Sequence, residues 1–229
     1  MSTLKIPASR NVRSAAHVLL VAVLFGGGCP GPVEPVSKTA VHTAAMAGDL
    51  EAVEAALASG VDVNAPGRSD ATPLHHAVWG DKVEVVKFLV AKGARVSAVD
   101  SSDRTPLHYA AQNNFVATAA ALIDAGADPD VQNVYGYSPL ISAAMEGRLE
   151  VIALLVARGA DVNLPDLAAK TPLHFALKQK QDAAARALVE AGADLNAVDR
   201  EGRRPLTEGR ARGVDAATLD FLVARGARD

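Results

Sequence analysis

An interval of 33 residues recurs through most of the chain. It separates five prolines, which are Pro73, Pro106, Pro139, Pro172 and Pro205. It also separates five glycines, which are Gly60, Gly93, Gly126, Gly159 and Gly192. Two independent markers with one period indicate a repeat protein, in which each unit buries its apolar face against its neighbours. A sixth glycine, Gly226, follows Gly192 after 34 residues, so we expect one extra residue in the last unit, in the loop near Gly213.

Each unit carries the signals of two helices. A hydroxyl residue precedes the recurring proline at Thr72, Thr105, Ser138 and Thr171. That pair is typical of an N-cap and the first helical position. A second helix follows, with apolar positions such as Val86 and Leu89 at helical spacing, and is expected to end at the recurring glycine. Segments such as Asp161-Val162-Asn163 then supply the turn chemistry of a projecting loop, so the pattern predicts an all-α fold.

The tetrapeptide Thr-Pro-Leu-His stands at residues 72–75, 105–108 and 171–174, and Gly-Ala-Asp begins at Gly126, Gly159 and Gly192. This pattern resembles the ankyrin repeat. The resemblance implies an ankyrin-repeat solenoid over residues 36–229, with about six helix-turn-helix units and projecting loops. The units are expected at about 36–66, 67–99, 100–132, 133–165, 166–198 and 199–229. The first unit departs from the motif at Ala40 and the last at Arg204 and Thr207, which suits capping units.

Residues 1–28 have the layout of a secretory signal peptide. The apolar run 15–25 follows a basic stretch and ends at three glycines. A membrane-spanning helix needs about 20 apolar residues, so this run is too short to span a bilayer. We expect cleavage before Cys29.

Cys29 is the only cysteine, so it can form neither an intrachain disulfide nor a multi-cysteine metal site. The segment before it resembles a bacterial lipoprotein signal, although Gly26 stands where Leu is usual. This resemblance implies lipidation of Cys29 and anchoring in the bacterial cell envelope, at the outer membrane, on its periplasmic or surface face. Residues 29–35 are expected to be a Pro-rich tether. The alternative is ordinary cleavage that releases a soluble periplasmic protein.

Several kinds of chemistry are not expected. All 26 acidic residues lie after Cys29 and outnumber the basic ones there, so nucleic acid is a poor partner. The histidines at 42, 75, 108 and 174, which share one position of four units, cannot form a zinc site, because packed helices lie about 8–10 Å apart. The ankyrin resemblance instead implies that these histidines bond neighbouring loops. No catalytic motif is present, so we expect no enzyme activity, no cofactor and no metal.

In the ankyrin family, partners are commonly held on the concave face, by the loop tips and the exposed edge of the first helix. The resemblance therefore implies that this chain, as a monomer, binds another protein. Trp79, Tyr135 and Tyr137 offer large amphipathic rings for an interface, but Trp79 could equally pack on its own helix pair. By register, the predicted partner-binding residues are Arg68, Trp79, Arg104, Gln112, Asn113, Tyr135, Tyr137, Met145, Glu146, Lys170 and Lys178.

The leading hypothesis is a non-catalytic interaction module held in the envelope by a lipid anchor. An alternative is an inhibitory or protective, immunity-like protein that masks an enzyme or toxin. An enzyme with an unrecognised site and a mechanical spacer are further alternatives, since a repeat fold does not choose among roles. The arginines between residues 200 and 212 either form a solvated cap or contact an acidic partner or anionic lipid.

Overall fold

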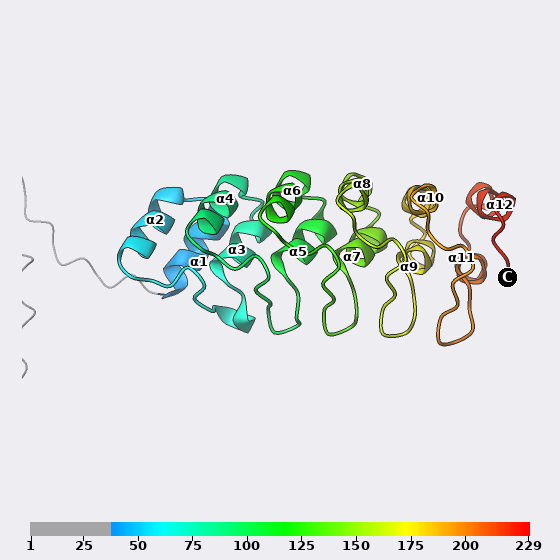
Figure 1. Cartoon of the computed structure of the whole chain (residues 1–229), viewed down its shortest axis with the longest axis horizontal. Coiled ribbons are helices and arrows are strands. Elements are labelled where there is room, and N and C mark those ends of the chain that lie inside the picture. The colour runs from blue at the N-terminus through cyan, green and yellow to red at the C-terminus, as the bar shows by residue number, and fades with distance from the viewer. Residues whose placement is uncertain (1–37) are drawn as a thin grey trace, which may run out of the picture. The chain divides into compact units, whose positions relative to one another are not determined.

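The 33-residue period corresponds to a series of helix pairs in the computed structural model, which describes residues 38–229 (Figure 1). The first helices are α1 (Lys38–Ala47), α3 (Pro73–Trp79), α5 (Pro106–Asn113), α7 (Pro139–Glu146), α9 (Pro172–Lys178) and α11 (Pro205–Arg212). The second helices are α2 (Leu50–Ala58), α4 (Val83–Ala91), α6 (Val116–Asp124), α8 (Leu149–Ala157), α10 (Asp182–Glu190) and α12 (Ala216–Ala224). The prediction of an all-α solenoid with six helix-turn-helix units is confirmed.

Residues 38–229 also contain one short 3-10 turn besides the helix pairs. This turn, η1 (Arg68–Asp70), lies in the loop before α3. None of the helices in residues 38–229 is long and apolar enough to cross a membrane. The predicted signal peptide, Cys29 and the tether lie outside the described residues.

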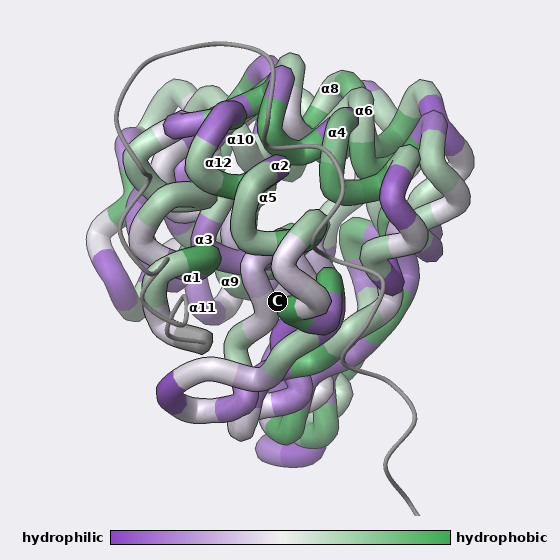
Figure 2. The backbone as a smooth tube through the Cα atoms, turned by 90° about the vertical axis from the view of Figure 1, so that its left-hand side faces the viewer, coloured by the Kyte–Doolittle hydropathy of each residue, from purple (hydrophilic) through white to green (hydrophobic). Residues whose placement is uncertain are grey.

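The helices form two layers, and the loops project beside the layer of first helices (Figure 1). A view along the stack separates the even-numbered helices from the odd-numbered ones (Figure 2). Within each layer, helices of consecutive units contact one another, as α5 contacts α3 and α7. The core lies between the layers, where leucines recur at one position of the first helix and one of the second. These fully buried leucines are Leu74, Leu107, Leu140, Leu173, Leu89, Leu122, Leu155 and Leu188.

The predicted helix boundaries are confirmed in the regular units. Helices α3, α5, α7, α9 and α11 each begin at the recurring proline. Just after each second helix stands a glycine whose φ lies between 89° and 95°. At Gly126, for example, a Cβ atom would meet nothing within 4 Å. The left-handed backbone alone therefore requires glycine there. In the first unit, which has Ala40 in place of proline, the helix starts earlier, at Lys38.

The loops connect one unit to the next through side-chain amides. As predicted, Asp62 Oδ1 accepts the N–H of Asn64 in a tight turn (2.9 Å). Beyond that prediction, Asn64 Oδ1 accepts the backbone N–H of Arg95 (2.8 Å), and its Nδ2 donates to the Gly93 carbonyl (3.2 Å). The same pair of bonds recurs at Asn163 and Asn196. Consecutive second-helix ends are thereby joined in register.

The histidine of each Thr-Pro-Leu-His segment joins its own helix to the next loop. The Thr105 N–H donates to His108 Nδ1 (3.1 Å), and His108 Nε2 lies 2.8 Å from the Tyr137 carbonyl. His75 and His174 make the same contacts with the carbonyls of Arg104 and Arg203. Since Nδ1 accepts a hydrogen bond, the ring is neutral and carries its proton on Nε2. The structural role of these histidines is confirmed, and residues 38–229 contain no cluster of three or more possible metal ligands.

Candidate protein-binding site

A cavity of about 310 Å³ lies between the third and fourth units, on the side of the first helices and loops. Two loops and the helices that follow them form its walls. The lining residues are Ser102 and Arg104 in the loop before α5, Gln112 in α5, Asn133, Tyr135 and Tyr137 in the loop before α7, and Ser142, Met145 and Glu146 in α7. The volume lies near the lower end of ligand pockets, about 300 Å³, which suits one or two inserted side chains.

Asn133 positions the two tyrosines of the cavity wall. Its Oδ1 accepts the backbone N–H of Tyr135 (2.9 Å) and of Tyr137 (3.0 Å), which fixes the turn between them. The turn also depends on Gly136, because φ is 78° there and a Cβ would lie 2.6 Å from the backbone nitrogen of Leu167. Tyr135 is left 60% exposed at the rim of the cavity.

Tyr137 is held more firmly than Tyr135. Its ring meets the edge of Phe175 in the next unit, with 5.0 Å between centroids, and lies 5.7 Å from the ring of Tyr135. Burial raises the pKa of the Tyr137 hydroxyl, so Tyr137 is neutral at physiological pH. Neither tyrosine hydroxyl has a hydrogen-bond partner within residues 38–229.

The opposite wall carries a neutralised arginine. The Arg104 guanidinium lies over the ring of Tyr109, 4.3 Å from its centroid, and its Nε lies 3.4 Å from Asp100 Oδ2. Burial alone would raise the pKa of Asp100, but hydrogen bonds from the Tyr109 hydroxyl and the backbone of Arg104 and Ser102 lower it below its ordinary value. Asp100 is therefore ionised and balances the charge of Arg104.

The helix ends supply polar groups to the cavity. The Gln112 carbonyl accepts a hydrogen bond from Arg148 Nε (2.9 Å), whereas its side-chain amide has no hydrogen-bond partner in the described part of the chain. Glu146 lies 4.0 Å from Arg148, and both side chains are about 40% exposed. This ion pair is long and solvated, so it contributes little to stability. Gln112 and Glu146 are thus available to a partner.

The structure brings together six of the eleven predicted partner-binding residues. They line the same cavity and are Arg104, Gln112, Tyr135, Tyr137, Met145 and Glu146. Three further lining residues, Ser102, Asn133 and Ser142, were absent from the prediction. Their small polar side chains carry no signal of binding by themselves.

The other five predicted residues lie elsewhere. Arg68 is exposed in η1, and Asn113 is exposed at the end of α5, where its Nδ2 donates to the Tyr109 carbonyl. Lys178 lies over the ring of Phe175, with Nζ 5.8 Å from its centroid. Lys170 is 13% exposed and forms ion pairs with Asp199 and Glu201.

Trp79 packs within the stack, which is the alternative that its sequence position left open. Its ring centroid lies 4.5 Å from that of His76 and 5.3 Å from that of Tyr109. The indole Nε1 is buried without a hydrogen-bond partner among the described residues. Burial, together with the nearby rings of His42 and His75, lowers the pKa of His76 to about 4. At neutral pH this cluster is therefore an uncharged aromatic contact between units.

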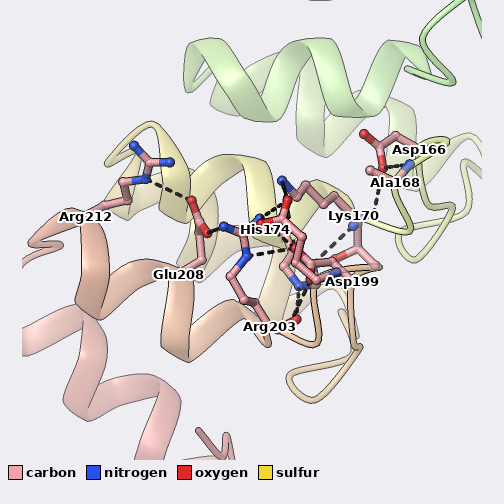
Figure 3. Close-up of polar contacts among 10 residues, drawn as sticks. Asp166, Ala168, Lys170, His174, Asp199, Arg203, Glu208 and Arg212 are labelled. Carbon is pink, nitrogen blue, oxygen red and sulfur yellow. Dashed lines mark hydrogen bonds and ion pairs between the residues drawn. The ribbon is translucent and has the colours of Figure 1, made fainter.

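A second polar cluster joins the fifth and sixth units (Figure 3). Asp199 Oδ2 accepts hydrogen bonds from Arg203 Nε (3.1 Å) and Nη2 (3.0 Å), and lies 3.8 Å from Lys170 Nζ. Arg203 also reaches Glu208, which accepts a hydrogen bond from Arg212 (2.9 Å). The charges alternate along this cluster, so its members satisfy one another. These arginines of the last unit form an ion-paired cap.

Comparison with known families agrees with this architecture. The family model described as "Ankyrin repeats (3 copies)" matches residues 11–100 and 97–166, and the model described as "Ankyrin repeat" matches residues 170–200. The first match extends into the predicted signal peptide, which remains a prediction. A search of curated proteins gave no match to the chain. Ankyrin repeats are protein–protein interaction modules, and the matches cover most of the sequence. The chain belongs to the ankyrin repeat family.

Proposed function

We propose that the chain is a non-catalytic module that binds one protein partner on the face formed by its first helices and loops. The observation that carries the proposal is the convergence of tyrosine, arginine, methionine and glutamate side chains on one cavity. Tyr, Arg and Met are enriched at interfaces, and a few such residues in a central pocket dominate binding energy. In this account the chain acts as a monomer and does not bind nucleic acid.

Exposed apolar side chains beside the cavity support a binding site on the same face. Val134, which is 44% exposed, precedes Tyr135 in the same loop, and Leu167, which is 59% exposed, lies in the loop of the next unit. The Val134 N–H donates to the Ser102 carbonyl (3.2 Å), so adjacent loop tips are joined through their backbones. A partner that covers these tips would bury apolar area around the cavity and exclude water from it.

Replacing Tyr135 by Ala is expected to weaken partner binding at least tenfold, or about 1.4 kcal/mol. The ring is exposed, so its loss should leave the thermal unfolding of the stack unchanged. The measurement is affinity capture from cell-envelope fractions with residues 36–229 as bait, which form one unit with its own core. The matched control is Val223→Ala in α12, where the side chain is 46% exposed in the other layer. Equal capture of the partner by the wild type, Tyr135→Ala and Val223→Ala would reject this face as the binding site.

We further propose that lipidation of Cys29 anchors the chain in the bacterial cell envelope, with the soluble periplasmic form as the alternative. Support comes from the apolar run and the glycines that precede this cysteine, and more than one acyl chain gives stable anchoring. The wild type is expected to incorporate labelled fatty acid and to fractionate with membranes. Cys29→Ala is expected to do neither. Equal labelling of the two proteins, or a mature N-terminus at another residue, would contradict the anchor.

A further inference from the structure

One column of the repeat is filled by a large side chain in the second, third, fifth and sixth units. It is the position three residues after the recurring proline. Its occupants there are His76, Tyr109, Phe175 and Glu208. In the fourth unit the same position holds Ser142, which lines the cavity.

The neighbouring units show what a large side chain does in this column. Phe175 is 2% exposed, and its ring lies against that of Tyr137 in the loop of the preceding unit, with 5.0 Å between centroids. Tyr109 lies beneath the Arg104 guanidinium and donates its hydroxyl to Asp100 Oδ2 (2.5 Å). In both units an aromatic ring fills the space between the first helix and the loops. The hydroxyl of Ser142 only donates back to the Ser138 carbonyl (3.2 Å), so the corresponding space stays open.

We infer that this cavity receives an aromatic side chain from the partner polypeptide, in the place that Tyr109 and Phe175 fill in the adjacent units. The inference rests on the proposed function and specifies its anchor residue. The inserted ring would meet the Tyr137 ring, the Met145 thioether and the Arg104 guanidinium, three groups that attract aromatic faces or edges. The amide of Gln112 is available to a polar tip such as a phenol.

The charges of the cavity argue for a neutral side chain. A partner lysine or arginine would meet Arg104 in the wall, and a partner carboxylate would meet Glu146 at the helix end. Arg104 is already balanced by Asp100, so it offers no uncompensated charge to a partner carboxylate, and the Glu146 carboxylate is exposed to solvent, 4.0 Å from Arg148. An aromatic ring can pack against the Tyr137 and Met145 side chains of the wall without adding a desolvated ion that lacks a partner.

The test is a random-peptide phage library selected on residues 36–229, with each enriched peptide then measured on two variants. Ser142→Phe fills the column as Phe175 does, whereas Val223→Phe adds the same ring at an exposed position of α12, in the other helical layer, and is the matched control. Peptides that bind the wild type are expected to share an aromatic residue, to bind Val223→Phe within threefold, and to bind Ser142→Phe at least tenfold more weakly. Thermal unfolding checks that both variants are folded.

A second readout does not depend on the variants. Met145 lines the cavity, whereas Met46 lies in the first unit and is 49% exposed. An enriched peptide should shift the Met145 methyl resonance in an NMR titration and leave that of Met46 unchanged. Peptides without an aromatic residue, equal binding to Ser142→Phe, no enriched peptide, or an unmoved Met145 resonance would each overturn the inference. The proposed function would survive those results if Tyr135→Ala still weakens partner capture, and would fail if it does not.

Discussion

Lowering the pH from 7 to 4 is expected to reduce the free energy of unfolding by about 3 kcal/mol through His108 alone. His108 is 1% exposed, and burial lowers its pKa to about 4, with smaller effects from the Tyr137 carbonyl, Arg104, Asp100 and His75. In the unfolded chain the ring has its ordinary pKa of about 6.5. Between these values the unfolded chain binds a proton that the folded chain does not. Stability is therefore full above pH 6.5 and is lost as the pH falls through 4.

The hydrogen bonds of His108 give the physical reason. Nδ1 accepts the Thr105 N–H at the start of α5, so protonation would break the helix cap. Burial lowers the pKa values of His75 and His174 as well, and their contributions have the same sign. Urea unfolding of the wild type and His108→Gln at a series of pH values measures the effect. The variant should lose about 3 kcal/mol less over this range, and an identical pH dependence of the two proteins would contradict the assignment.

Replacing Asp199 by Ala is expected to lower stability by roughly 3 kcal/mol. The side chain is fully buried, and its Oδ1 accepts the N–H groups of Glu201 and Arg203 (both 2.9 Å). Its Oδ2 accepts hydrogen bonds from the Arg203 guanidinium and lies near Lys170 (Figure 3). Removing the carboxylate leaves two backbone donors without their acceptor and takes from Arg203 and Lys170 their buried partner, so that Arg203 keeps Glu201 and Glu208 and Lys170 keeps Glu201. Thermal unfolding and hydrogen exchange of α11 and α12 measure the loss.

The matched variant is Asp199→Asn, which copies the fourth unit. There Asn133 caps the same turn through its Oδ1, without a charge. Asp199→Asn should retain the turn and lose only the ion pairs, so its effect should be clearly smaller than that of Asp199→Ala. It should also change the acid response. Burial alone would raise the pKa of Asp199, but the hydrogen bonds from Arg203 and Glu201 lower it, so its stabilising effect is lost only in strong acid. Equal losses in both variants would show that the turn contributes nothing.

The fold could be predicted from the sequence because each boundary depends on a local rule. Pro106 can begin a helix but not lie within one, and Gly126 adopts a left-handed backbone that other residues avoid. Each rule concerns only a few neighbouring residues, so the residues that mark the helix ends can be recognised in the sequence every 33 residues. The hydrogen bonds made by the side-chain amides of Asn64, Asn163 and Asn196 were not predicted, because each bond reaches a backbone group about 30 residues away in the sequence.

The site could be predicted only in part, because a cavity depends on what neighbouring side chains leave unfilled. Register placed Tyr135, Tyr137 and Met145 on the face that carries the cavity, since that face follows from the repeat. It could not separate Trp79, which packs against His76 and Tyr109, from the residues that line the cavity. Comparing the residues at the same position of each unit would have found Ser142, the small residue at the position that Tyr109 and Phe175 occupy in the neighbouring units. The ion pairs of Lys170 with Asp199 and Glu201 could not be predicted from its register position, because both partners come from the next unit.

The central claim is that a protein partner covers the face around the cavity, and site-specific photo-crosslinking in living cells tests it most directly. A photo-reactive phenylalanine analogue would replace the exposed Tyr135 in one strain and the exposed Ala153 of α8, in the other helical layer, in a second strain. We predict that position 135 gives one crosslinked protein of defined mass and that position 153 gives none. The same product from both positions, or a product from position 153 alone, would contradict the proposed binding face.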